Sequence, residues 1–162
     1  TDGSEIWHSL YGGGSSDGGN HVSEVSGGGF IIAGSTKSYG NGNWDDMWLV
    51  KTSTGGSMEW QKTYGGNYTE IGNYVHEKVS GGYIITGSTE SIGQGLYDIW
   101  VVSTDYTGNE IYSQTFGGNM DDKALRGSKS DNGELLIIGY TSSFGNGGDD
   151  VLFIKIDPNY HP

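Results

Sequence analysis

The hydrophobic residues of this chain fall into short runs separated by turns rich in glycine, asparagine and aspartate. The middle third shows this most clearly: runs 83–86 and 99–102 are almost continuously apolar, whereas 72–79 and 110–116 mix polar and apolar residues. A continuous apolar run of this length is typical of a strand buried on both faces, and a mixed run favours a strand near the rim of a sheet. No segment repeats apolar residues at helical spacing over a helical length, so we expect an all-β protein.

The same four-strand pattern occurs three times along the chain. Its markers are an aromatic residue before a glycine pair, a glycine at the end of the second strand, and an aspartate that opens the third. They stand 52 or 53 residues apart, at Tyr11, Tyr64 and Phe116, at Gly34, Gly87 and Gly139, and at Asp46, Asp98 and Asp150. Repeats near this length indicate solenoids, propellers or arrays, and a four-stranded sheet covered on both faces by its own copies is a propeller blade. The sequence therefore predicts a β-propeller made of three four-stranded blades per chain.

The repeats are out of phase with the ends of the sequence. Residues 1–11 align with the fourth strand of the other repeats. We expect residues 12–64 to form the first blade and 65–116 the second. Residues 117–157 would form a third blade that lacks its own outer strand. The whole chain, 1–162, would then be a single repeat domain, or half a propeller.

This mismatch predicts self-association. An unfilled sheet edge exposes unpaired backbone N–H and C=O groups, and propellers usually close with about four to eight blades. We expect the N-terminal strand of one copy to complete the last blade of another, through Glu5, Ile6, Trp7, Leu10 and Tyr11. The product would be a closed six-bladed dimer or a head-to-tail filament. A piece of a longer propeller and a three-bladed closure are the alternatives.

Composition narrows the classes of partner. Glycine supplies 31 of 162 residues, but aromatic residues make up 12% and fall at repeated positions, which favours an ordered, turn-dense chain over a disordered one. A net charge of −12 disfavours nucleic acids and anionic membrane surfaces as partners. The apolar runs are too short to span a bilayer, so we expect no membrane insertion. With no cysteine, the sequence has no disulfides or zinc–thiolate sites.

Two stretches carry a resemblance to known repeats. One is DIWVV at 98–102, followed by Tyr112, and the other is WQKTYGG at 60–66, followed by GGYIITG at 81–87. Together with their counterparts they resemble the repeats of secreted bacterial and archaeal β-propellers and, more loosely, the kelch repeat. The resemblance implies a secreted or cell-surface protein that serves as a binding platform, an adhesin or an accessory module.

Residues present in every repeat are better explained as scaffold than as a single active site. Asp side chains commonly accept hydrogen bonds from nearby backbone N–H groups in turns. We therefore interpret Asp46, Asp98 and Asp150 as turn-capping groups, and likewise the acids at the start of each repeat. These are Asp17, Glu70 and Asp122. No loop has the alternating acidic ligands of a calcium site, so we expect neither a metal ion nor a cofactor.

The ligand-binding candidates are residues that the repeats do not share. Lys123, Arg126 and Lys129 gather on the inner strand of the third repeat, where they would bind an anion or form part of a solvated channel wall. Trp44 lies in an insertion of the first repeat, where an exposed ring could stack on a sugar. Asn67 opens a sequon for N-glycosylation.

No catalytic residue is expected. His21 and His76 lie on inner strands without an evident nucleophile or acid partner. Our first hypothesis is a non-enzymatic, extracellular structural or adhesive module that assembles head-to-tail. The alternative is a lectin-like propeller that binds carbohydrate. A hydrolase or lyase acting in the channel is disfavoured, because the sequence offers no asymmetric acid–base constellation.

Overall fold

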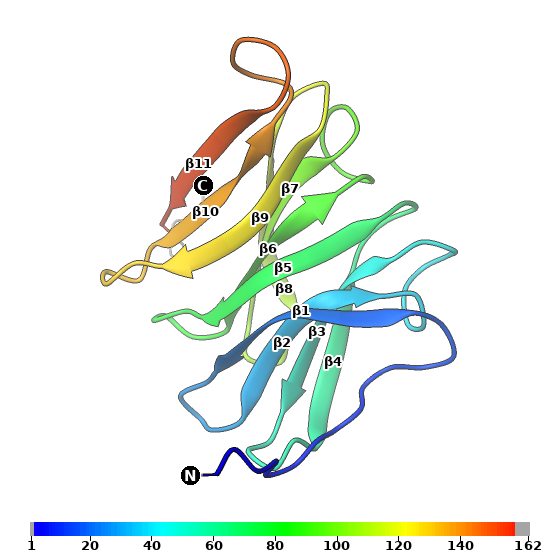
Figure 1. The fold of residues 1–162 in the computed structure, drawn as a ribbon, viewed down its shortest axis with the longest axis vertical. Helices are drawn as coiled ribbons and strands as arrows, with labels where there is room; N and C mark the ends of the chain where they lie inside the picture. The colour runs from blue at the N-terminus through cyan, green and yellow to red at the C-terminus, as the bar shows by residue number, and fades with distance from the viewer. Residues whose placement is uncertain (1, 158–162) are drawn as a thin grey trace.

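The computed structural model describes residues 2–157, and within that range the chain consists of strands, turns and loops without a helix (Figure 1). Eleven strands form three antiparallel sheets in these residues. Sheet 1 contains β1 (Asp17–Glu24), β2 (Phe30–Thr36), β3 (Asp46–Thr52) and β4 (Met58–Tyr64). Sheet 2 contains β5 (Glu70–Glu77), β6 (Tyr83–Thr89), β7 (Asp98–Thr104) and β8 (Glu110–Phe116). Sheet 3 contains β9 (Asp122–Lys129), β10 (Leu135–Thr141) and β11 (Asp150–Ile156).

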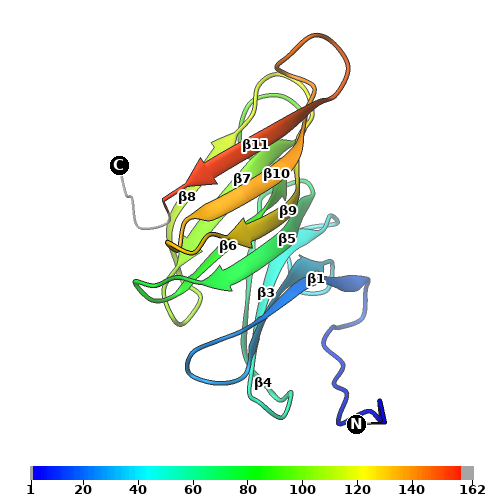
Figure 2. The same ribbon diagram turned by 60° about the vertical axis from the view of Figure 1, so that its left-hand side comes forward.

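The all-β prediction and its repeated sheets are confirmed, and the arrangement is consistent with a partial propeller. In each sheet the strands follow one another in chain order, with the first strand of each repeat at one edge. β5 lies against β1, β2 and β3 of the first sheet, and β9 lies against β5, β6 and β7 of the second. The three sheets therefore follow one another through the molecule, as two views show (Figures 1 and 2).

Two apolar layers hold the sheets together. The layer between sheets 1 and 2 includes Ile31, Leu49, Val75, Ile85 and Trp100. The layer between sheets 2 and 3 includes Ile84, Ile99, Val101, Leu135 and Ile137. Sheet 2 thus contributes side chains to both layers, which explains why its two central strands are almost continuously apolar.

The repeated glycine of the second strand is required by a close approach between strands. A β-carbon placed on Gly34, Gly87 or Gly139 would lie 1.8, 1.7 or 1.9 Å from a backbone carbonyl oxygen of the neighbouring first strand. In each sheet this contact lies at a β-bulge in the first strand. Only glycine avoids that clash, because it has no side chain.

Residues 2–16, which precede β1, form no strand in the single chain. Figure 1 places this segment beside sheet 1 at the bottom of the molecule, whereas sheet 3 lies at the top. Within the described part of this segment, residues 2–11, the predicted pairing with β11 therefore does not occur in the single chain. The described residues also include no helix that is long and apolar enough to cross a membrane.

Candidate assembly interface

The N-terminal segment docks on sheet 1 through alternate residues. The rings of Trp7 and Phe30 lie 5.9 Å apart between centroids and are inclined by 53°. The Tyr11 hydroxyl donates a hydrogen bond of 2.6 Å to the carbonyl oxygen of Gly56, in the turn before β4. An extended segment whose alternate side chains face one sheet has the geometry of a strand.

The outer strand of sheet 1 makes the same two contacts with sheet 2. The rings of Trp60 and Tyr83 lie 5.8 Å apart and are inclined by 53°. The Tyr64 hydroxyl donates a hydrogen bond of 2.6 Å to the carbonyl oxygen of Gly108. All four residues are the repeat equivalents of those in the N-terminal contact, 52 or 53 positions later. Residues 7–11 therefore pack on sheet 1 in the same way that the outer strand β4 packs on sheet 2.

The backbone conformation of the glycine that leads into an outer strand is also present before Glu5. Gly56 and Gly108 precede β4 and β8 and have φ values of +79° and +77°. Gly3, their repeat equivalent, has a φ of +76°. This left-handed conformation favours glycine, so the three positions share a backbone requirement as well as a residue type.

The opposite face of the N-terminal segment is exposed and partly apolar. Ile6 and Leu10 are each 93% exposed. His8 lies between them and its ring nitrogen lies 2.8 Å from a carboxylate oxygen of Glu5, in an exposed pair. The single chain therefore leaves two large apolar side chains of the predicted assembly strand in contact with water.

Sheet 3 has an open edge where sheets 1 and 2 have an outer strand. β3 pairs with β4 and β7 pairs with β8, but within residues 2–157 no strand pairs with the far edge of β11. The sheet face that points away from sheet 2 is apolar, since Val151 is 79%, Phe153 62% and Ile138 48% exposed. The edge leaves backbone N–H and C=O groups unpaired, and the face leaves apolar side chains exposed. Both features favour contact with a further strand.

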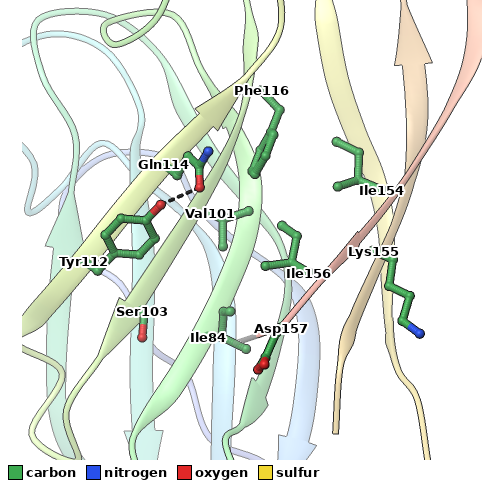
Figure 3. A pocket seen from close by; sticks show the side chains of 10 residues that line it. All are labelled: Ile84, Val101, Ser103, Tyr112, Gln114, Phe116, Ile154, Lys155, Ile156 and Asp157. Carbon is green, nitrogen blue, oxygen red and sulfur yellow. Dashed lines mark hydrogen bonds between the residues drawn. The ribbon is translucent and has the colours of Figure 1, made fainter. Parts of the chain in front are cut away.

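A cavity of about 270 Å³ opens between sheets 2 and 3 next to this edge. Its apolar wall is formed by Ile84, Val101, Phe116, Ile154 and Ile156. Figure 3 shows Phe116 of β8 facing the two isoleucines of β11 across this space. The sequence did not reveal the cavity, because its walls come from two repeats whose spacing depends on how the sheets pack.

Polar groups line the outer side of the cavity. The Tyr112 hydroxyl donates a hydrogen bond to the side-chain oxygen of Gln114, and both residues belong to β8. Lys155 lies at the rim, and its side chain points away from the cavity in Figure 3. The cavity is therefore apolar toward the sheet layer and polar toward the surface.

The repeated aspartates at the start of the third strands cap loops, as predicted. Each carboxylate accepts a hydrogen bond from a backbone N–H in the loop before its strand. The pairs are Asp46 with Asn41 (2.5 Å), Asp98 with Gln94 (2.7 Å) and Asp150 with Asn146 (3.0 Å).

The acids that open each repeat cap the glycine pairs in the same way. Their carboxylates accept hydrogen bonds from backbone N–H groups four residues earlier. The pairs are Asp17 with Gly13 (2.9 Å), Glu70 with Gly66 (2.9 Å) and Asp122 with Gly118 (2.8 Å). Both sets of acids are therefore scaffold, and among the residues that the structure describes no group of three or more His, Cys, Asp or Glu is placed to hold a metal ion.

Packing of the sheets brings these two sets of acids together. Burial raises the pKa of Asp46, and the neighbouring carboxylates of Glu70 and Asp45 raise it further. Burial likewise raises the pKa of Asp98, with a contribution from Asp122. Burial also acts to raise the pKa of Asp17, but hydrogen bonds from Ser38, Thr36 and Gly13 outweigh it and hold that pKa at about 2.

The three basic residues on β9 contact three different partners. The Lys123 ammonium lies 3.6 Å from the ring centroid of Tyr97. Arg126 donates to the carbonyl oxygen of Leu125 at 2.8 Å, and Lys129 donates to the backbone oxygen of Glu77 at 3.4 Å. They do not converge on a common point through these contacts, so their predicted role in anion binding stays a prediction.

The two remaining candidates lie in surface loops. Trp44 is 50% exposed in the loop between β2 and β3. Asn67 is exposed in the turn between β4 and β5. Both positions are accessible, and sugar stacking at Trp44 and glycosylation at Asn67 stay predictions.

A ladder of asparagine side chains links the sheets, and sequence reasoning missed it. The Asn20 amide donates to the carbonyl oxygen of Gly72 at 3.0 Å, and the Asn73 amide donates to that of Ala124 at 2.6 Å. Each asparagine lies at the bulge of its first strand. The bulge in sheet 3 carries Leu125 instead. The repeat spacing alone aligns these three residues, so the sequence held the signal.

Comparisons with known proteins add no assignment. None of the protein-family models matches the chain, and no curated protein matches it in sequence.

Proposed function

We propose that this protein is a self-assembling, non-enzymatic β-propeller module with a structural or adhesive role outside the cell. In the assembly, residues 5–11 of one copy become the outer strand on β11 of another copy. The observation that supports this most strongly is the docking of Trp7 and Tyr11 on sheet 1, which repeats the contacts of Trp60 and Tyr64 on sheet 2.

The internal repeats define the pairing that such an assembly would have. Outer strand β4 pairs Tyr64 with Met47, Lys62 with Leu49 and Trp60 with Lys51, and Glu59 is skipped at a bulge. Transferred by the repeat spacing, Tyr11 pairs with Val151, Ser9 with Phe153 and Trp7 with Lys155, while Ile6 takes the bulge position. The pairs again place side chains of matching orientation on the same face of the sheet.

Docking of this kind would also bury the free face of sheet 3. With the strand in place, Val151 and Phe153 would face sheet 1 of the neighbouring copy, as Met47 and Leu49 of sheet 1 face sheet 2. Full burial of such side chains contributes about 1.5–3 kcal/mol each. The same head-to-tail contact produces a closed six-bladed dimer if its rotation closes the ring, and a filament if it does not.

The extracellular location and the adhesive role rest on the resemblance of the repeats to those of secreted propellers. A carbohydrate-binding module is the second candidate, favoured by the half-exposed Trp44 ring at a loop tip. A glycan array separates the two: binding that is lost in Trp44→Ala supports the lectin, and silence of both proteins removes it.

Two complementary variants test the assembly. Removal of residues 1–11 deletes the donated strand, and Phe153→Lys puts a charge on the accepting face, where the native side chain is 62% exposed. Light scattering after size exclusion is expected to give a multiple of the 17.3 kDa chain mass for the full chain and the single-chain mass for each variant.

A mixture of the two variants provides the control. The shortened chain keeps an intact accepting edge and Phe153→Lys keeps an intact strand, so the mixture is expected to form one productive interface and a two-chain species. Assembly of the shortened chain to the same extent as the full chain would contradict the proposal.

A further inference from the structure

We infer that the face of β8 that points toward sheet 3 is the docking site for the turn at Gly3 of a second copy, and that the turn fits there because it carries no side chain. This β8 surface is formed by Tyr112, Gln114 and Phe116, which line one wall of the cavity between sheets 2 and 3 (Figure 3). The inference rests on the proposed function and extends the contact from strand pairing on sheet 3 to a second sheet.

The turn before each outer strand packs on the fourth-strand residues of the repeat before it. A β-carbon placed on Gly108, before β8, would lie 2.7 Å from the ring of Trp60 and 2.7 Å from the side chain of Lys62. One placed on Gly56, before β4, would lie 2.6 Å from the ring of Trp7. Both glycines are buried. Such a close approach leaves no room for a side chain at either position.

Gly3 does not make this contact in the single chain. It is exposed, and a β-carbon placed on it would meet nothing within 4 Å. The repeat spacing indicates the corresponding partners, because Tyr112 and Gln114 of β8 are the equivalents of Trp60 and Lys62, 52 positions later. A strand added to β11 would bring its own preceding turn against these two side chains of β8.

The proposed register leads the second copy to this surface. Thr104 pairs with Glu110 at the start of β8. The equivalent pair on β11 is Ile156 with Glu5 of the second copy, and Ile156 lines the same cavity as the β8 surface. Gly3 stands two residues before Glu5, so strand pairing would place it beside the opposite wall, which belongs to β8.

The requirement for glycine selects a second copy over the chain's own continuation. The repeat position of Gly108 recurs 52 residues later at Tyr160, which lies outside the described residues, and in a second copy it falls on Gly3. A contact without room for a β-carbon accepts glycine and excludes tyrosine. The φ of +76° at Gly3 also matches the +77° at Gly108.

The site keeps the shape of the internal contacts without all of their hydrogen bonds. The Tyr64 hydroxyl donates to the carbonyl oxygen of Gly108, whereas Phe116, its equivalent on the β8 surface, has no hydroxyl. The close fit of the glycine turn, rather than that hydrogen bond, would therefore hold the second copy. This makes association sensitive to any side chain added at Gly3.

The decisive variant is Gly3→Asn, with Gly148→Asn as its matched control. Asparagine tolerates the left-handed conformation, so the substitution tests the available space. Gly148 is also exposed, has a φ of +71° and has open space around its β-carbon position. Its repeat equivalent, Leu96, is 57% exposed although a sheet follows it, which places this position outside the contact.

Light scattering over a dilution series of the full-length proteins gives the association constant. Gly3→Asn is expected to weaken association roughly 10- to 100-fold, because the added side chain overlaps the ring of Tyr112. Gly148→Asn is expected to associate like the native chain. Both variants are expected to unfold like the native chain when dilute, which ties any loss of association to the contact.

Two further variants locate the contact. In a Tyr112→Ala background the ring is absent, so Gly3→Asn is expected to weaken association less than it does in the native chain. Additive effects of the two substitutions would contradict a contact between them. Removal of residues 158–162 is expected to leave association intact, and its loss would assign the β8 surface to the chain's own continuation.

The outcomes separate this inference from the proposed function. A native chain that stays monomeric at all concentrations contradicts the proposed function and the docking of Gly3 together. A native chain that assembles, with Gly3→Asn associating equally well, overturns only the docking of Gly3 on β8.

Discussion

β7 and β11 occupy equivalent places in sheets 2 and 3 and have similar sequences, DIWVV and DVLFI, yet their surroundings differ. Every residue of β7 is buried, whereas β11 is half-buried and exposed in alternation. β7 has a sheet on each face and a strand on each edge; in residues 2–157, β11 has a sheet on one face and a strand on one edge. The sequence of β11 is thus typical of a strand that is buried on both faces and paired on both edges, although in the described residues β11 is covered on one face and paired on one edge.

The largest expected effect is a difference in stability between substitutions at equivalent positions of β3 and β11. Leu49 and Phe153 are repeat equivalents on the same face of sheets 1 and 3, but Leu49 is 0% and Phe153 62% exposed. Leu49→Ala is expected to lower the free energy of unfolding by about 2–5 kcal/mol because it leaves a cavity in the core. Phe153→Ala is expected to change it by no more than about 0.5 kcal/mol in the single chain.

Urea unfolding of dilute, monomeric protein measures both losses, and light scattering measures association. Phe153→Ala is expected to weaken association although it leaves the single chain intact. Equal losses of stability in Leu49→Ala and Phe153→Ala would contradict the difference in burial between these two positions.

A buried histidine makes sheet 2 sensitive to acid at a position that has no counterpart in sheet 3. His76 on β5 is buried, and neither of its ring nitrogens has a hydrogen-bond partner among the described residues, whereas its equivalent in sheet 3, Ser128, is exposed. Burial lowers the pKa of His76 to about 4, with smaller contributions from Lys129 and His21.

The sign of the pH effect follows from this lowered pKa. The unfolded chain, with its ordinary histidine pKa, binds the proton more readily than the folded chain, so stability is lost as pH falls from about 6.5 to about 4. This single group accounts for a loss of about 3 kcal/mol. His76→Phe is expected to flatten the pH dependence of urea unfolding over that range, with His8→Gln as the exposed control. An unchanged slope in His76→Phe would contradict the assignment.

The smallest effect concerns the asparagine ladder. Asn73→Ala removes the bond to Ala124 and is expected to cost about 1 kcal/mol of stability. Leu125→Asn restores the missing amide at the third bulge, where it would reach the Gly19 carbonyl of the next copy. It is expected to tighten association by roughly fivefold and to leave the single chain unchanged. Weaker association in Leu125→Asn would mean that sheet 3 meets sheet 1 of the next copy in a different geometry.

Most of the fold could be predicted because its signals are local and repeated. The apolar runs locate the strands, and the acids recur at the turns that they cap. The repeated Gly87 also marks the bulge that it accommodates, although the sequence could not show that a carbonyl oxygen would lie 1.7 Å from its β-carbon. Three copies of each signal allow a scaffold role to be told from a unique site.

The candidate site was predicted less completely, because it depends on distances between repeats. The strand phase indicated which residues would be donated, but not that Trp7 and Tyr11 would dock on sheet 1 of their own chain. Lys123 is placed over Tyr97 from the neighbouring sheet, a contact that no local signal encodes. The cavity beside Phe116 likewise arises only when sheets 2 and 3 pack together.

The central claim is that residues 5–11 of one copy pair with β11 of another in a single register. Its most direct test is a disulfide between two single-cysteine chains, Ser9→Cys and Phe153→Cys, because the native chain has no cysteine. On mild oxidation of the mixture, the account predicts a two-chain product that contains one chain of each kind. It also predicts little product when Leu10→Cys replaces Ser9→Cys, because that side chain points to the opposite face. Failure of the first pair to cross-link, or equal yields from both pairs, would contradict the account.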